Sequence, residues 1–135
     1  MPAQIFVDTG AWVALAAEDD VHHKEATSVY PGLLKNYELV TTNLVIAETY
    51  ILLRKASGHG PAISFLEMVE TSPRIRKVYS TAELEEEATK ILKGYADQDF
   101  SFTDAVSFVV MQRLKIKEAF AFDAHFSTMG FILIT

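Results

Sequence analysis

Short apolar runs alternate with longer segments of helical periodicity along the whole chain. The apolar runs predict strands at 5–8, 39–42, 77–79, 119–122 and 131–134. The segments between them predict helices at 10–17, 22–36, 44–57, 61–71, 82–95 and 103–114, with a short helical turn from Ala124. Because strands that alternate with helices are joined by right-handed crossovers, this order predicts an α/β fold in which helices cover both faces of a central parallel sheet.

The length and composition restrict the kinds of protein that this chain can be. With 135 residues, 50% of them hydrophobic and 22% charged, we expect a single packed domain over residues 1–135. The sequence contains no cysteine, which excludes disulfides, thiolate zinc sites and cysteine nucleophiles. Any metal ion must therefore bind to oxygen or imidazole ligands.

The balance of acidic and basic residues excludes further classes of function. A formal net charge of −6 argues against a surface that binds nucleic acid or membranes through bulk positive charge. It does not exclude a nuclease whose acidic residues hold cations. No apolar run approaches the roughly 18 residues that span a bilayer, and no charged leader precedes the first apolar run. We therefore expect a soluble, cytoplasmic protein with no membrane partner.

Three aspartates occupy the ends of predicted elements. Asp8 and Asp123 each end a predicted strand, and both would point from the edge of a parallel sheet at which ligands collect. Asp104 lies in the first turn of the helix predicted at 103–114, which is apolar nearly all round and should be central. An alternative stays open for each, because a helix-capping Asp stabilises a protein by about 1 kcal/mol. For Asp104, the spacing from Ser101 is that of a capping box.

Glu48 is harder to explain as a structural residue. On a helix drawn at 100° per residue it lies in the middle of an apolar stripe, whose members are Leu44, Val45, Ile51 and Leu52. Burying an unpaired carboxylate costs several kcal/mol or forces its protonation, so this position requires a cationic partner. Lys55, two turns further along, is one candidate partner, and a metal ion is the other.

Four carboxylates from distant segments would repel one another unless a cation neutralised them. Without cysteine, and without a histidine near Asp8, Glu48 or Asp104 along the sequence, the ligand set favours Mg²⁺ or Mn²⁺ over Zn²⁺. Carboxylate sites of this kind suit the attack of water on a phosphodiester. The chemistry by itself therefore indicates phosphodiester hydrolysis.

The segments IFVDTGAW, TTNLVIAETY, DQDFSFTDAVSFVVM and AFAFDAHFSTMGF together resemble a PIN domain, and most closely the toxin-type ribonucleases of the VapC family. The resemblance covers essentially the whole chain and implies that Asp8, Glu48, Asp104 and Asp123 form the metal site. It further implies that the hydroxyl groups of Thr9, Ser101 and Thr103 contact water or phosphate. It also implies a supporting polar position at Asn43 and a further acidic position at Asp99.

The same resemblance implies a PIN-type α/β/α sandwich and a metal-dependent endoribonuclease that cuts single-stranded or loop RNA. It also implies a homodimer that acts as the toxin of a toxin–antitoxin pair and is inhibited by an antitoxin protein. A catalytically silent PIN-like scaffold that only binds a partner is the alternative. A phosphotransfer receiver is disfavoured, because the chain lacks an acidic pair before the first strand and a lysine after the last.

Histidine and aromatic residues near these segments have two possible interpretations. His125 follows Asp123 closely enough to approach the site, but we do not assign it as a ligand. The other histidines, His22, His23 and His59, are expected to be exposed. Packing in the core is favoured over stacking on RNA bases for Trp12, Phe100, Phe102 and Phe126.

Overall fold

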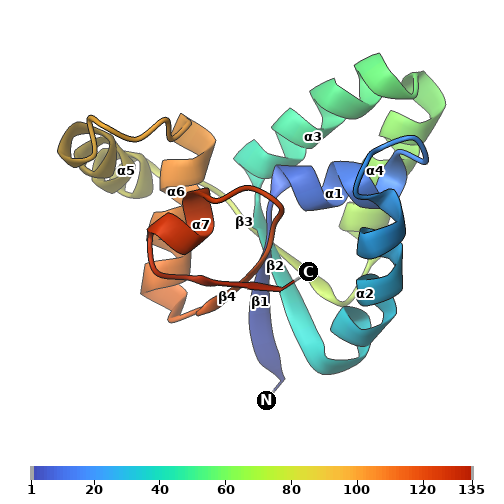
Figure 1. Ribbon diagram of the computed structural model, residues 1–135, viewed down its shortest axis with the longest axis horizontal. Coiled ribbons are helices and arrows are strands. Elements are labelled where there is room, and N and C mark those ends of the chain that lie inside the picture. Colours follow the sequence, from blue (N-terminus) through green and yellow to red (C-terminus); the bar gives the residue numbers. More distant parts are fainter. Residues whose placement is uncertain (1, 135) are drawn as a thin grey trace.

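A five-stranded parallel sheet forms the centre of the computed structural model, which describes residues 2–134. The strands are β1 (Ala3–Val7), β2 (Tyr37–Thr42), β3 (Ile75–Val78), β4 (Glu118–Phe120) and β5 (Ile132–Ile134). Their order across the sheet is β3-β2-β1-β4-β5, and every neighbouring pair is parallel (Figure 1).

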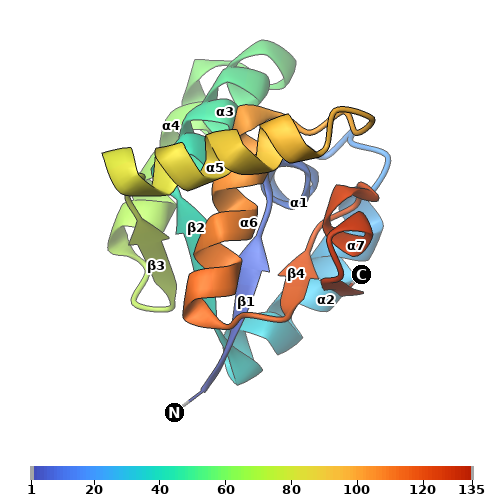
Figure 2. The ribbon, with the colours of Figure 1, turned by 90° about the vertical axis from the view of Figure 1, so that its left-hand side faces the viewer.

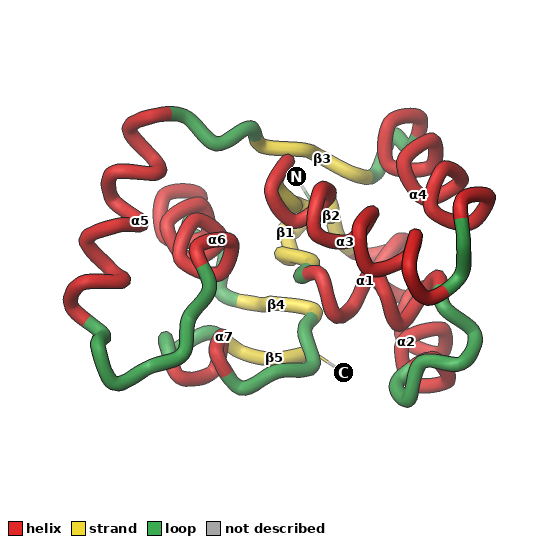
Figure 3. Tube along the Cα trace, turned by 90° about the horizontal axis from the view of Figure 1, so that it is seen from above, coloured by secondary structure: helices red, strands yellow, loops and turns green. Residues whose placement is uncertain are grey.

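Helices cover both faces of this sheet. They are α1 (Thr9–Ala16), α2 (His23–Asn36), α3 (Asn43–Ala56), α4 (His59–Thr71), α5 (Ala82–Gly94), α6 (Phe102–Leu114) and α7 (His125–Thr128). Helices α1 to α4 lie on one face (Figures 1 and 3), whereas α6 lies against the other face with α5 on its outer side (Figures 2 and 3). The predicted α/β/α sandwich with a central parallel sheet is confirmed. Within residues 2–134, no helix is both long and apolar enough to cross a membrane.

The buried strands and helices follow from their apolar sequences. In β1, Ile5, Phe6 and Val7 are completely buried, as expected for a central strand covered on both faces. In α6, every residue from 104 to 111 is buried, which confirms that this helix is central. Its N-terminus has a complete capping box, and it ends at Lys115 in the left-handed conformation, with φ of 59°.

The strand boundaries differ from the predicted ones by one or two residues. The third strand begins at Ile75 rather than at residue 77, because Ile75 pairs with Leu39 of β2. The fourth strand ends at Phe120, two residues earlier than expected. Pairing with neighbouring strands, rather than the local apolar run, decides where each strand begins and ends.

The sheet has a switch point between β1 and β4. From β1 the chain continues to β2 and β3 on one side, whereas β4 and β5 lie on the other side. Ligands of open α/β sheets bind at the carboxyl ends of the strands at such a point. Asp8 follows β1 directly, and its N–H donates to the carbonyl of Phe120 at the end of β4, at 3.1 Å. The fold thus joins the first and last predicted acidic segments at the place where a ligand is expected.

Candidate active site

Asp8 has a buried carboxylate that does not serve as a helix cap. It occupies the position before α1, but its side chain makes no capping bond, so the capping alternative is wrong for this residue. Only 4% of Asp8 is exposed. Burial, and then the charges of Asp123, Asp104 and Glu48, raise the pKa of Asp8 well above its ordinary value, although a backbone N–H bond opposes this. The carboxylate of Asp8 is therefore buried close to three other carboxylates.

Asp104 makes a structural bond and also belongs to the acidic cluster, the name used for Asp8, Glu48, Asp104 and Asp123. Its backbone N–H donates to Ser101 Oγ at 3.0 Å, and its Oδ2 accepts from the Ser101 N–H at 3.0 Å. The capping box is therefore confirmed. The same Oδ2 lies 2.9 Å from His125 Nδ1. Burial raises the pKa of Asp104, and the bonds from Ser101 and His125 oppose that rise.

The loop after β4 brings a histidine to the site. Ligand atoms of Asp104, Asp123 and His125 all lie within 4.8 Å of one another, the geometry of a possible metal-binding group. Asp123 is exposed, and its Oδ1 accepts the His125 backbone N–H at 2.9 Å. No histidine lies near Asp104 along the sequence, but His125 adjoins it in space. The only sequence signal for His125 was its position two residues after an aspartate that ends a strand.

Glu48 is anchored by a hydroxyl group rather than by a lysine. Thr9 Oγ1, at the start of α1, donates to Glu48 Oε1 at 2.9 Å. Among residues 2–134, the ion pairs do not include one between Glu48 and Lys55, so the structural alternative with Lys55 is wrong. Thr9 is 5% exposed and Glu48 is half-buried. The predicted supporting role of Thr9 therefore has a direct contact behind it.

The predicted apolar stripe around Glu48 is wrong in its orientation. Ile51 and Leu52 are 52% and 44% exposed, whereas the buried face of α3 consists of Val45, Ile46, Thr49 and Leu53. Helix α3 packs against both α1 and α4, so two neighbours decide which side is buried. Glu48 consequently lies at the margin of the buried face and not in its middle.

The remaining supporting positions differ in their surroundings. Asn43 Oδ1 accepts the Ser80 N–H at 2.7 Å, which fastens the start of α3 to the segment after β3. Asp99 is exposed. Thr103 is half-buried, and its carbonyl accepts the Ser107 hydroxyl at 2.8 Å. Of the five supporting residues, Thr9 and Ser101 are therefore the two that bond directly to a carboxylate of the cluster.

Most of the aromatic residues near the site belong to the core. Trp12 and Phe126 are 1% and 0% exposed, which confirms the core interpretation. Phe100 is half-buried and packs edge-on against both Phe108, at 5.0 Å, and His125, at 5.3 Å. The expectation fails for Phe102, which is 40% exposed at the first position of α6. His22 and His23, expected to be exposed, are half-buried, whereas His59 is exposed.

The donor set is suited to a hard divalent cation. The group with metal-binding geometry consists of Asp104, Asp123 and His125 and does not include Asp8 or Glu48. Asp104 of this group and the neighbouring Asp8 are both buried, and burial raises the pKa of each. Burial is the main cause of the raised pKa of Asp8, and repulsion from the neighbouring carboxylates adds to it. A cation near these groups would offset that repulsion. Oxygen-rich sites of this kind prefer Mg²⁺ or Mn²⁺.

Comparison with known proteins identifies the family. Residues 5–132 match the model of the PIN domain, and the chain belongs to this family.

Its relatives include VapC proteins. The chain is 38% identical over 128 residues to the 23S rRNA-specific endonuclease VapC20 of Mycobacterium tuberculosis, and the match covers 95% of each chain. It is 32% identical over 124 residues to a VapC ribonuclease of Archaeoglobus fulgidus, covering 90% of this chain and 78% of that protein. The resemblance to VapC-type ribonucleases is therefore confirmed.

Solved structures agree with this assignment. The crystal structure of Mycobacterium tuberculosis VapC20, described as a toxin that cleaves the sarcin–ricin loop, has a TM-score of 0.89 at 37% identity and covers 95% of this chain and 96% of that one. FitAcB from Neisseria gonorrhoeae has a TM-score of 0.68 at 12% identity, covering 97% of this chain and 96% of that one, and supports the fold alone.

Proposed function

We propose that this protein is a metal-dependent endoribonuclease that hydrolyses phosphodiester bonds of single-stranded or loop RNA, as the toxin of a toxin–antitoxin pair. The observation that carries the proposal is the convergence of acidic residues at the switch point of the sheet. There the buried Asp8 lies close enough to Asp104, Asp123 and Glu48 for their charges to act on it. The similarity to proteins named as VapC ribonucleases supports RNA as the substrate.

In this proposal Asp8, Glu48, Asp104 and Asp123 hold Mg²⁺ or Mn²⁺. A cation bound there would supply activation of water and neutralisation of charge on the phosphodiester. The chain itself supplies orientation. Thr9 holds one oxygen of Glu48, while His125 and the Ser101 N–H both hold Oδ2 of Asp104. Such bonds to ligand side chains reduce their freedom to rotate away from the site.

The test is cleavage of a sarcin–ricin loop hairpin, the RNA named for VapC20. With Mg²⁺ or Mn²⁺ the purified protein should cut the hairpin and leave 5′-phosphate ends, because water and not the ribose 2′-hydroxyl attacks. Excess EDTA should abolish cleavage. Cyclic phosphate products, or full activity in EDTA, would refute the metal mechanism. A folded protein that cuts no RNA with either metal would favour the silent scaffold.

Matched variants separate the site from its surroundings. Asp104→Asn should lower the cleavage rate at least about 100-fold, the range found when a single charge-stabilising group is removed from an active site. Asp97→Asn changes an exposed aspartate in the loop before α6 and should cleave like the wild type. Equal losses in both variants would mean that net charge, and not the site, determines the rate.

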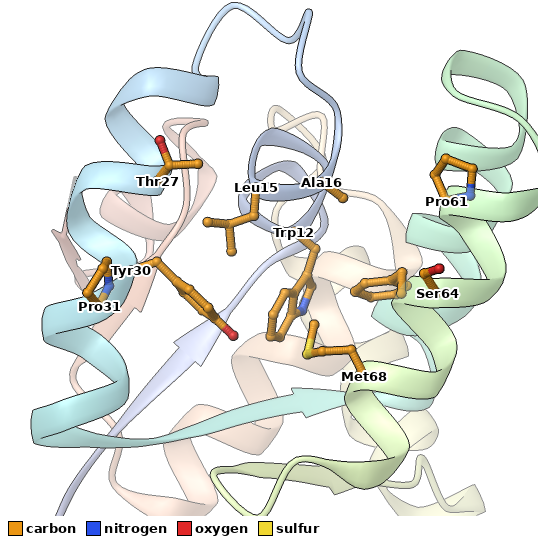
Figure 4. Close-up of a pocket in the computed structure, with 10 residues that line it drawn as sticks. Trp12, Leu15, Ala16, Thr27, Tyr30, Pro31, Pro61, Ser64 and Met68 are labelled. Carbon is orange, nitrogen blue, oxygen red and sulfur yellow. The ribbon is translucent and has the colours of Figure 1, made fainter.

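An apolar groove offers a docking surface for the antitoxin. It has a volume of about 450 Å³ between α1, α2 and α4, and Figure 4 shows Trp12, Tyr30 and Met68 pointing into it from those three helices. A neighbouring cavity, which shares Ala16 and Pro61 with the groove, also has Glu18 and Asp19 in its lining. We propose that an apolar helix or extended segment of the antitoxin lies here, with basic residues directed at the acidic groups.

The basic residues of the antitoxin should include an Arg or Lys near the acidic cluster, since Arg forms forked bonds with carboxylates. Changing Asp8, Asp104 and Asp123 to Asn should weaken binding of the antitoxin encoded beside this protein. Met68→Glu in the groove should weaken it as well, whereas Ile132→Glu, on strand β5 and outside the lining of the groove, should not. Expression of this protein alone should arrest growth. Undiminished binding of both sets of variants would contradict this docking.

We also propose that the protein forms a homodimer. Ile51 and Leu52 are exposed apolar residues on α3, and a second copy of the chain would cover them. Light scattering should give about twice the monomer mass of 15.1 kDa. Replacing both residues with Glu should give the monomer, and a monomeric wild type at micromolar concentration would refute the proposal.

A further inference from the structure

Two aromatic rings stack face to face beside the acidic cluster. The imidazole of His22, just before α2, and the ring of Phe122 lie within 5° of parallel, with centroids 4.2 Å apart. Phe122 immediately precedes Asp123, is half-buried, and packs edge-on against the buried Phe120 at 5.8 Å. The side chain of His22 is 44% exposed. One face of the imidazole therefore rests on Phe122, while part of the ring stays open to solvent.

The segment that carries His22 is held by bonds on either side of the ring. The His22 backbone N–H donates to Asp20 Oδ1 at 2.9 Å, and His23 Nδ1 lies 2.7 Å from the Ala14 carbonyl. Val21, the residue before the ring, is 88% exposed. The loop thus presents apolar surface whose backbone is already ordered, so a ligand that binds there loses little conformational entropy.

We propose that His22 and Phe122 form a stacking platform for an unpaired RNA base next to the phosphodiester that is cleaved. This rests on the proposed function, because it takes RNA as the ligand and Asp123 as a metal ligand. Phe122 directly precedes Asp123 in the sequence, so the stacked pair adjoins one member of the acidic cluster.

Charge explains why such a platform is needed. The chain has a net charge of −6 and a cluster of carboxylates at this edge of the sheet, so bulk attraction of phosphates contributes little to binding. Stacking of a base on an aromatic ring does not depend on net charge and tolerates any base sequence. His22 and Phe122 are positioning residues in this proposal, since neither touches the reacting atoms.

A double-mutant cycle between the His22 ring and the RNA bases tests the platform. The affinity for a set of sarcin–ricin loop hairpins, each lacking one loop base, is measured by titration in a buffer that contains Ca²⁺ in place of Mg²⁺. Loss of the stacked base should weaken binding to the wild type about tenfold, and binding to His22→Ala less than about twofold. His22→Phe keeps a flat ring without charge and should restore the wild-type response. His59→Ala, an exposed histidine at the start of α4, is the matched control and should bind like the wild type.

Turnover separates positioning from a purely structural effect. His22→Ala and Phe122→Leu should each raise KM about tenfold while kcat stays within about twofold. A structural role alone would instead lower Tm and kcat together. If every missing base weakens the wild type and His22→Ala equally, or if His22→Ala affects antitoxin binding but not RNA binding, the platform is refuted. Base-specific coupling without cleavage under any metal would support the platform and refute the nuclease function.

Discussion

The hydrogen bond from Thr9 to Glu48 is the most direct link between the fold and the proposed chemistry. It joins the first turn of α1 to the middle of α3 across 39 residues of sequence, at 2.9 Å. Thr9→Val removes the donor while keeping the shape of the side chain. Glu48 would then lack the bond that orients its carboxylate toward the other acids.

The magnitude follows from two opposing effects. A hydrogen bond to a charged group contributes about 1.5–3 kcal/mol to stability, whereas the additional buried methyl group of Val contributes about 0.8 kcal/mol. Thr9→Val should therefore lower the free energy of unfolding by about 1–2 kcal/mol. Because water reaches the half-buried Glu48 and replaces part of the lost bond, the lower end is expected. Activity should fall more steeply, by about 10–100-fold, as is typical when a residue that orients a metal ligand is lost.

The assay measures the cleavage rate of the hairpin as a function of Mg²⁺ concentration, together with urea unfolding. Thr9→Ser keeps the hydroxyl and should retain most of the activity. Thr49→Val is the matched control: it removes a different buried hydroxyl, on α3 next to Glu48, whose partner is the Val45 carbonyl at 2.7 Å, and should leave cleavage unchanged. Wild-type rates and metal response in Thr9→Val would refute the reasoning. Equal losses of cleavage rate in Thr9→Val and Thr49→Val would mean that general destabilisation, and not the bond to Glu48, causes the loss.

Three further predictions concern the acidic cluster. The metal-free protein should lose stability as the pH rises above about 3.9, the ordinary pKa of aspartate. Burial and neighbouring charges raise the pKa of Asp8 and Asp104, so the folded state keeps protons that the unfolded chain has released. Thermal unfolding in EDTA measures this loss of stability, and saturating Mg²⁺ should remove it. Asp8→Asn should make the stability less dependent on pH. It should also raise Tm at pH 7 by a few degrees, the shift expected for about 1 kcal/mol. His125→Ala should lower the initial cleavage rate about 10–100-fold, and an unchanged rate would exclude a role in holding Asp104. Ser101→Ala should lower the free energy of unfolding by about 1 kcal/mol in urea titrations, through loss of the capping bond.

The sequence by itself was sufficient for the features that depend on local pattern. The alternation of apolar runs and helical segments determined the α/β class, since each element must bury its apolar face against a neighbour. The apolar character of α6 on all sides determined its central place, which its buried residues from 104 to 111 confirm. The spacing of Ser101 and Asp104 determined the capping box, because such a bond forms within one helical turn.

Only the tertiary structure decided the features that join distant segments. Thr9 meets Glu48 across 39 residues, and His125 meets Asp104 across 21. Helical periodicity alone placed Glu48 on the wrong part of the buried face of α3, because contacts with both α1 and α4 set the rotation of that helix. Side-chain partners, helix rotation and strand ends depend on which elements pack together. The signals of a single sequence are local, so they indicated candidate acidic residues but not which side chains bond to them.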